Sequence, residues 1–178
     1  MTRIYKEAES FANKFQTRNP YTLLDAIGAR LKISDEYEQN GLKGYSTILN
    51  RTMFAVVNGK LNEYERRVVV GHEAAHLILH KADIMLSPAK AMRDFDLFSS
   101  TGRLEHQANQ FLADFLISDD ELMEVSSDED SDYFATARSL KIPPPLLAFK
   151  LYSMIQRGFN LKNPTDIKSN FLAGGGVW

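Results

Sequence analysis

The stretch GHEAAHLILH, residues 71 to 80, holds three of the four histidines of the chain. On a helix that turns by about 100° per residue, His72, Glu73 and His76 fall within one arc. The flanks of this arc are apolar, and an unpaired polar group against packed hydrocarbon is costly, so the arc must face a cleft, a partner group or a metal. Histidines four residues apart have neighbouring side chains, and both can direct a ring nitrogen at one ion. The spacing therefore indicates the H-E-x-x-H pattern of a metal site.

The competing interpretation is a core helix whose histidines hydrogen-bond to their neighbours, because a five-residue motif can arise by chance. A second helical pattern, from Leu104 to Ile117, favours the metal, since Glu105 lies at the centre of its apolar face. A carboxylate is almost never fully buried unless it is paired or coordinated. We therefore expect His72, His76 and Glu105 to bind one Zn²⁺, with water in the fourth position. The polar residues of this second helix lie on its opposite face: His106, Gln107, Gln110 and Asp114.

Glu73 lies between the two histidines and is not needed to hold the ion. Bound zinc lowers the pKa of its water toward about 7, so Glu73 can take a proton from that water as it attacks a peptide carbonyl. Glu73 then returns the proton to the leaving amine. The motif is used for this chemistry in zinc peptidases, and we expect Glu73 to be the catalytic residue.

Further residues are candidates for supporting roles. Asn109, one turn after Glu105, could accept the second ring N–H of a ligating histidine, and a packing role is an equal alternative. His80 is expected beside the ligands or at the helix end, where the helix dipole stabilises its charge. The candidates for stabilising the oxyanion are Tyr45, His80 and Arg103.

Sequence patterns also predict the elements that carry these residues. Residues 5–15 and 21–31 show apolar residues at helical spacing. Two runs rich in β-branched and aromatic residues, within residues 41–58, indicate a β-hairpin with its turn at Asn50-Arg51. Asn62, with a glutamate three residues later, caps the helix that carries the histidines.

The remaining segments are predicted to be mostly helical. Ser118 begins another capping box and an acidic stretch that runs to Asp132. Residues 133–140 and 146–159 are typical of helices. We predict an α+β fold, in which a small antiparallel sheet packs against the H-E-x-x-H helix and further helices surround it. The expected organisation is a single domain over residues 1–178, with N-terminal helices (1–40), a catalytic core (41–118), a C-terminal helical part (119–160) and a tail (161–178).

The composition restricts the classes of function. The 178 residues are 44% apolar, carry a formal charge of −2 and include no cysteine, so any metal must be held by nitrogen and oxygen. No apolar run is long enough to span a bilayer and no signal peptide is visible, so we expect a cytoplasmic protein. A net charge near neutrality gives no overall attraction to nucleic acid.

The motifs resemble those of the ImmA/IrrE family of metallopeptidases, formerly a domain of unknown function. The resemblance rests on three segments in order, VVN at 56–58, RRVVVGHEAAHLILH at 66–80 and EHQANQFLADFLI at 105–117. It implies a zincin-like fold and Glu105 as the third zinc ligand. This chain departs from the family pattern at Ala75, Leu112 and Ser118, which touch none of the proposed ligands.

The resemblance also implies a substrate. Similar proteins of phages, other mobile elements and stress responses relieve repression by cleaving a helix-turn-helix repressor, so a protein partner of this kind is expected here. One alternative is a non-proteolytic metal-containing module that binds a repressor or another partner. Another is a DNA-binding regulator that uses the locally basic residues Arg138, Lys141, Lys150 and Arg157. A helix pair with a solvated basic face is the more common structure for such a segment, and we expect it to be a partner surface. The oligomeric state does not follow from the sequence.

Overall fold

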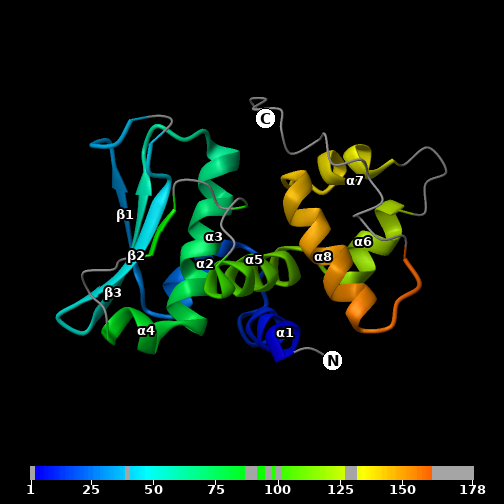
Figure 1. The fold of residues 1–178 in the computed structure, drawn as a ribbon, viewed down its shortest axis with the longest axis horizontal. Coiled ribbons are helices and arrows are strands. Elements are labelled where there is room, and N and C mark those ends of the chain that lie inside the picture. Colours follow the sequence, from blue (N-terminus) through cyan, green and yellow to red (C-terminus); the bar gives the residue numbers. More distant parts are fainter. Residues whose placement is uncertain are drawn as a thin grey trace.

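The computed structural model describes residues 3–38, 41–86, 92–94, 98, 102–126 and 132–161 (Figure 1). Among these residues, no helix is long and apolar enough to cross a membrane. The predicted tail lies outside the described residues, apart from its first position, 161. The helices are α1 (Arg3–Phe15), α2 (Pro20–Ala26), α3 (Glu63–Leu79), α4 (Lys81–Leu86), α5 (Arg103–Leu116), α6 (Asp119–Ser126), α7 (Tyr133–Ser139) and α8 (Pro144–Gln156). The strands are β1 (Arg30–Ser34), β2 (Gly44–Leu49), β3 (Thr52–Asn58) and β4 (Met92–Asp94).

The strands form one sheet in the order β1-β3-β2-β4. Strands β2 and β3 are the predicted hairpin, and both residues of its turn, Asn50 and Arg51, have positive φ angles of 50° and 65°. A turn with two left-handed residues matches the twist of the flanking strands. The α+β class is confirmed, but the sheet is mixed, because β1 runs parallel to β3 while the other pairs are antiparallel.

The predicted helix over residues 21–31 is too long, because α2 ends at Ala26. Gly28 has a φ of 75°, which favours glycine, and stops the helix. Its N–H donates to the carbonyl of Asp25, and the N–H of Ala29 donates to the carbonyl of Leu24. These two bonds form a Schellman cap, after which the chain is free to extend as β1.

Helix α3 lies between the sheet and α5, which crosses it on the other side (Figure 1). It begins as predicted, with the side chain of Asn62 accepting from the N–H of Glu65 at 2.8 Å. Every residue from Val68 to Leu77 is buried. A helix buried all round can carry polar groups only where a partner or an ion satisfies them.

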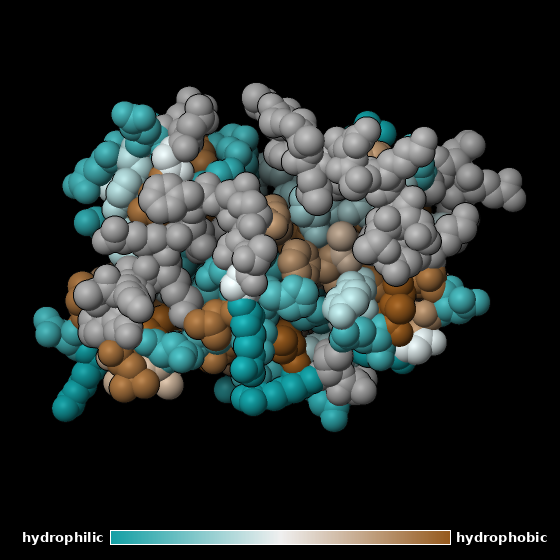
Figure 2. All heavy atoms as spheres, in the orientation of Figure 1, coloured by the Kyte–Doolittle hydropathy of each residue, from teal (hydrophilic) through white to brown (hydrophobic). Residues whose placement is uncertain are grey.

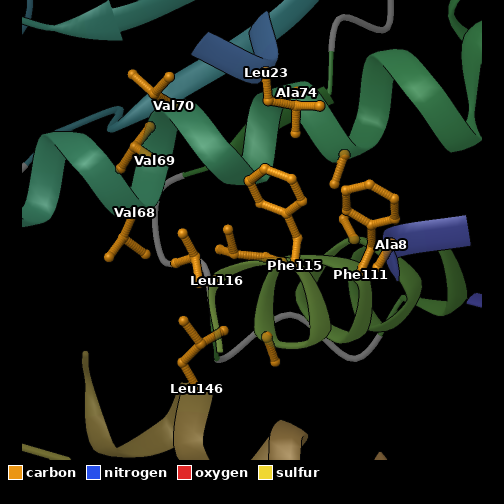
Figure 3. Packing of buried hydrophobic residues seen from close by; sticks show 14 of the residues in the cluster. Ala8, Leu23, Val68, Val69, Val70, Ala74, Phe111, Phe115, Leu116 and Leu146 are labelled. Atoms are coloured by element: carbon orange, nitrogen blue, oxygen red, sulfur yellow. The ribbon is translucent and has the colours of Figure 1, made fainter. Parts of the chain in front are cut away.

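Aromatic side chains of α5 fill the space below α3. Figure 3 shows Phe111 and Phe115 rising from α5 toward Ala74 of α3, with Leu146 of α8 on the opposite side of α5. Both phenylalanines are fully buried. Replacing one such buried residue with alanine lowers the free energy of unfolding by roughly 3–5 kcal/mol. The packing of the two rings therefore holds together the two helices that carry the candidate ligands.

The polar face of α5 is exposed at His106, as expected for a surface residue, but it is buried at Gln110 and Asp114. Helix α8 packs there, and both Asp114 and Lys150 are fully buried. The Nζ of Lys150 lies 3.3 Å from Asp114 and 2.7 Å from Asp119. Asp119 also accepts two hydrogen bonds from Arg157, and Ser153 donates one to Asp114 at 2.8 Å. Two carboxylates thus balance two cations in a buried cluster.

This cluster changes the interpretation of the C-terminal basic residues. Lys150 and Arg157 are predicted from sequence to belong to a solvated basic face, but they face the carboxylates of the cluster instead. The guanidinium of Arg157 also lies over the ring of Tyr5 on α1, 3.6 Å from its centre. The two cations therefore join α8 to α1, α5 and α6.

Candidate metal centre

Three predicted ligands from two helices converge on one point. The Nε2 atoms of His72 and His76 on α3 lie 2.9 Å apart, and Oε2 of Glu105 on α5 lies 3.1 Å and 3.3 Å from them. Ligands held at about 2.0–2.1 Å in a tetrahedral zinc site are separated by roughly 3.3 Å. The triangle of donor atoms is therefore close to the size of a tetrahedral zinc site and slightly smaller.

The contact expected for Asn109 is present. Its Oδ1 lies 2.9 Å from Nδ1 of His72, and both side chains are buried. An amide oxygen only accepts, so Nδ1 of His72 carries the proton, and in a neutral ring Nε2 then has a lone pair directed at the site. This arrangement suits a metal ligand, whose second ring nitrogen is usually held by a hydrogen-bond acceptor.

Glu105 adds a negative charge to the same point. Burial alone would raise the pKa of its carboxyl, but hydrogen bonds from His72 and His76 outweigh burial and hold this pKa well below its ordinary value. Such bonds need N–H groups on the two Nε2 atoms, whereas the contact with Asn109 leaves a lone pair on His72. A divalent cation among the three atoms removes this conflict, because it attracts both the lone pairs and the carboxylate.

His80 caps the end of α3 beside the ligands rather than among them. Its Nδ1 lies 3.0 Å from Nδ1 of His76, and its Nε2 lies 3.1 Å from Oε1 of Gln107. Burial lowers the pKa of His80 below its ordinary value, although the hydrogen bond to Gln107 opposes this effect. A neutral ring is favoured, with one nitrogen donating and the other accepting.

Glu73 is fully buried and lies against β2. The hydroxyl of Ser46 is within hydrogen-bond distance of its Oε2 and 3.0 Å from its backbone oxygen. A Cβ atom at Gly44 would lie 2.9 Å from Oε1 of Glu73 and 2.6 Å from Val69, so only glycine leaves room for the carboxylate in this position. Gly44 and Ser46 of β2 thus determine where the Glu73 carboxylate lies: glycine leaves room for it, and serine binds it.

Sequence reasoning missed Ser46, Gly44 and Gln107 as parts of the site. The signal for the first two is their spacing, because residues two apart on a strand point to the same face, and small residues there allow a helix to approach closely. Gln107 carries no comparable signal, since it belongs by helical angle to the face opposite Glu105 and reaches His80 only through the crossing of α3 and α5.

Two predicted candidates do not join the site. Tyr45 lies between Gly44 and Ser46 on β2, so strand alternation turns its side chain to the face of the sheet away from α3. Arg103 is exposed, and about 160° of helical turn separates it from Glu105. It lines an open pocket of about 440 Å³ on the outer side of α5, with His106 and Tyr152. Neither is placed to stabilise an oxyanion at the ligands.

Sequence comparisons agree with the geometry of the site. The chain is 28% identical over 118 residues to "Uncharacterized immunity region protein 2" of Bacillus phage phi105, which covers 66% of this chain and 70% of the phage protein. No solved structure gives a significant match. Residues 30–152 match the family Peptidase_M78, described as the IrrE N-terminal-like domain, and this range holds the three candidate ligands, Glu73 and the sheet. The chain therefore belongs to the Peptidase_M78 family of IrrE N-terminal-like domains.

Proposed function

We propose that this protein is a zinc-dependent endopeptidase. The observation that carries the proposal is the convergence of His72, His76 and Glu105 on one point, with Glu73 on the same helix as the two histidines but outside the triangle. Among the described residues, no fourth histidine, aspartate or glutamate joins the three. A site with three protein ligands keeps a position open for water or substrate, as catalytic zinc sites do. Membership of a peptidase family supports the same class of reaction.

Each of these residues would have a separate role in peptide-bond hydrolysis. His72, His76 and Glu105 would hold zinc, which when bound supplies a Lewis acid that acidifies water and polarises a carbonyl. Glu73 would accept the proton of the attacking water on its carboxylate and deliver it to the nitrogen of the leaving amine. Ser46 would hold that carboxylate in place through its hydroxyl. The buried surroundings of Glu73 strengthen these electrostatic contacts, because few water molecules screen them.

The substrate that we propose is a helix-turn-helix repressor. Two observations support it, the resemblance of the motifs to the ImmA/IrrE family and the relative in Bacillus phage phi105, whose name places that protein in an immunity region. Cleavage of such a repressor would relieve repression of a mobile element or a stress response. A repressor acts on DNA, so the reaction would take place in the cytoplasm.

The chain's own contacts weigh against a DNA-binding alternative. Lys150 is fully buried and faces Asp114 and Asp119, and Arg157 also faces Asp119. These two cations are therefore not available to phosphate groups. A non-proteolytic module that only binds a partner stays the competing function, and the experiment below separates it from an enzyme.

The test uses the purified protein and a purified helix-turn-helix repressor from the same genome. We expect about one zinc per chain, cleavage of the repressor, and loss of both after treatment with a chelator that is then removed. Returning zinc should restore cleavage. The variant His72→Ala should lose zinc and cleavage, whereas the matched control His106→Ala should keep both, because His106 is exposed on the outer side of α5. A chain that binds the repressor and relieves repression without cutting it would contradict the proposal.

A further inference from the structure

Besides the contact of His72 with Asn109, a chain of hydrogen bonds also leads from the candidate metal centre to α5. It runs from Nδ1 of His76 to Nδ1 of His80 at 3.0 Å, and from Nε2 of His80 to Oε1 of Gln107 at 3.1 Å. Both histidines are buried, and the backbone N–H of His80 donates to the carbonyl of His76 at 2.8 Å, which holds the backbone of His80 at the end of the helix.

The direction of this chain decides whether His76 can bind a metal. A neutral imidazole has one N–H and one lone pair, so of the two facing Nδ1 atoms one must donate and the other accept. If His80 donates from Nδ1, then Nδ1 of His76 accepts, and its Nε2 carries a proton toward the site. If His76 donates instead, its Nε2 has a lone pair there. Only the second direction allows His76 to be a ligand.

The group at the far end selects between these directions. The oxygen of Gln107 can only accept, so Nε2 of His80 must donate to it. The remaining nitrogen of His80, Nδ1, then accepts from Nδ1 of His76. The lone pair of His76 is thereby left on Nε2, 2.9 Å from Nε2 of His72.

We infer that Gln107 is a positioning residue of the metal centre, which sets the tautomer of His80 and through it the tautomer of the ligand His76. The inference rests on the proposed zinc site. It gives α5 three tasks within five residues: Glu105 is a ligand, Asn109 orients His72, and Gln107 orients His76 at one remove. Moving α5 relative to α3 would thus disturb all three ligands together.

The direct test is the tautomer of each ring in the zinc-loaded protein. With ¹⁵N-labelled histidine, NMR spectra contain signals from only four residues, and the variant His106→Ala removes one that lies outside the site. We expect His80 to carry its proton on Nε2 and His76 to carry its proton on Nδ1. A His80 ring protonated on Nδ1 while zinc is bound would overturn the inference.

Variants provide a second test, with zinc affinity as the readout. Gln107→Met keeps the length of the side chain but removes the acceptor, and it should weaken zinc binding by about 10–100-fold, the usual effect of losing such a partner. Gln107→Glu keeps an acceptor and should restore most of the affinity when measured at pH 8. The control is Gln156→Met, the same change at an exposed position that lines the outer pocket.

The outcomes separate this inference from the proposed function. Zinc affinity of Gln107→Met equal to that of the parent would overturn the role of Gln107 and leave the zinc site standing. Equal losses in Gln107→Met and Gln107→Glu would overturn it as well, because the acceptor would then not matter. A parent chain that binds no zinc would overturn the proposed function itself.

Discussion

The hydroxyl of Ser46 on β2 lies within hydrogen-bond distance of the Glu73 carboxylate on α3, although 27 positions separate the two residues. The contact links strand β2 of the hairpin, an inner strand of the sheet, to the centre of the H-E-x-x-H helix. Glu73 is fully buried, so a hydrogen bond to its carboxylate is little screened by water. The sheet therefore does more than support α3, since it supplies the group that aims the proposed base.

Replacing Ser46 with alanine should lower the rate of cleavage and leave zinc in place. A hydrogen bond to a charged group contributes about 1.5–3 kcal/mol, so a loss of roughly 10–100-fold in kcat is expected if the bond persists in the transition state. The zinc content should match that of the parent, because Ser46 contacts none of the three ligands. Ser10→Ala, at an exposed position of α1, is the control. Unchanged kcat in Ser46→Ala would show that Glu73 is aimed by other groups.

The buried ionic cluster makes a prediction about stability. Replacing Lys150 with methionine leaves Asp114 buried without its cation, and breaking a buried pair in this way costs about 3–5 kcal/mol. Urea unfolding monitored by circular dichroism measures the change. The same substitution at Lys6, which is exposed on α1, should have little effect. If both variants unfold at the same urea concentration, the cluster does not contribute to the stability of the C-terminal helices.

Asp119 predicts how stability depends on pH. Burial alone would raise the pKa of its carboxyl, but hydrogen bonds from Arg157 and Lys150 outweigh burial and hold the pKa well below its ordinary value. A depressed pKa in the folded state means that the stabilisation is complete above the unfolded pKa, about 3.9, and is lost as pH falls below it. The difference in unfolding free energy between the parent and Asp119→Asn should therefore be largest near pH 7 and shrink below about pH 4. A difference that grows toward acid pH would contradict the assignment.

Local signals predicted the ligand-bearing helices, and tertiary contacts account for what they missed. The cap at Asn62 and the apolar residues at helical spacing in α5 are properties of short segments, and both are present as predicted, although the side chain of Glu105 is partly buried, with 14% exposed. The contact of Ser46 with Glu73 depends on the packing of a strand against a helix, which periodicity does not contain. The same holds for Lys150, because nothing in its own helix shows that two carboxylates of α5 and α6 will face it.

Two further differences between the sequence pattern and the structure have definite physical causes. Residues 21–31 do have apolar residues at helical spacing, but Gly28 in the left-handed conformation ends the helix and allows β1 to form. Tyr45 is the neighbour of Ser46, which contacts Glu73, on strand β2. Its side chain nevertheless lies on the other face of the sheet, since neighbouring residues of a strand point in opposite directions. The glycine at position 28 predicts the end of the helix, and the alternation of side chains along a strand predicts the direction of Tyr45.

Figure 2 shows hydrophobic and hydrophilic residues mixed over the described surface of one face of the molecule, so the surface in this view does not by itself identify a partner.

Whether the protein cleaves its partner or only binds it is tested most directly by the rate of repressor cleavage with Glu73→Gln. This change keeps the size of the side chain and removes the basic carboxylate. The variant should retain about one zinc per chain and its affinity for the repressor, yet cleave about 10²–10⁴ times more slowly than the parent. Cleavage at the rate of the parent, with zinc bound, would show that Glu73 is not the general base.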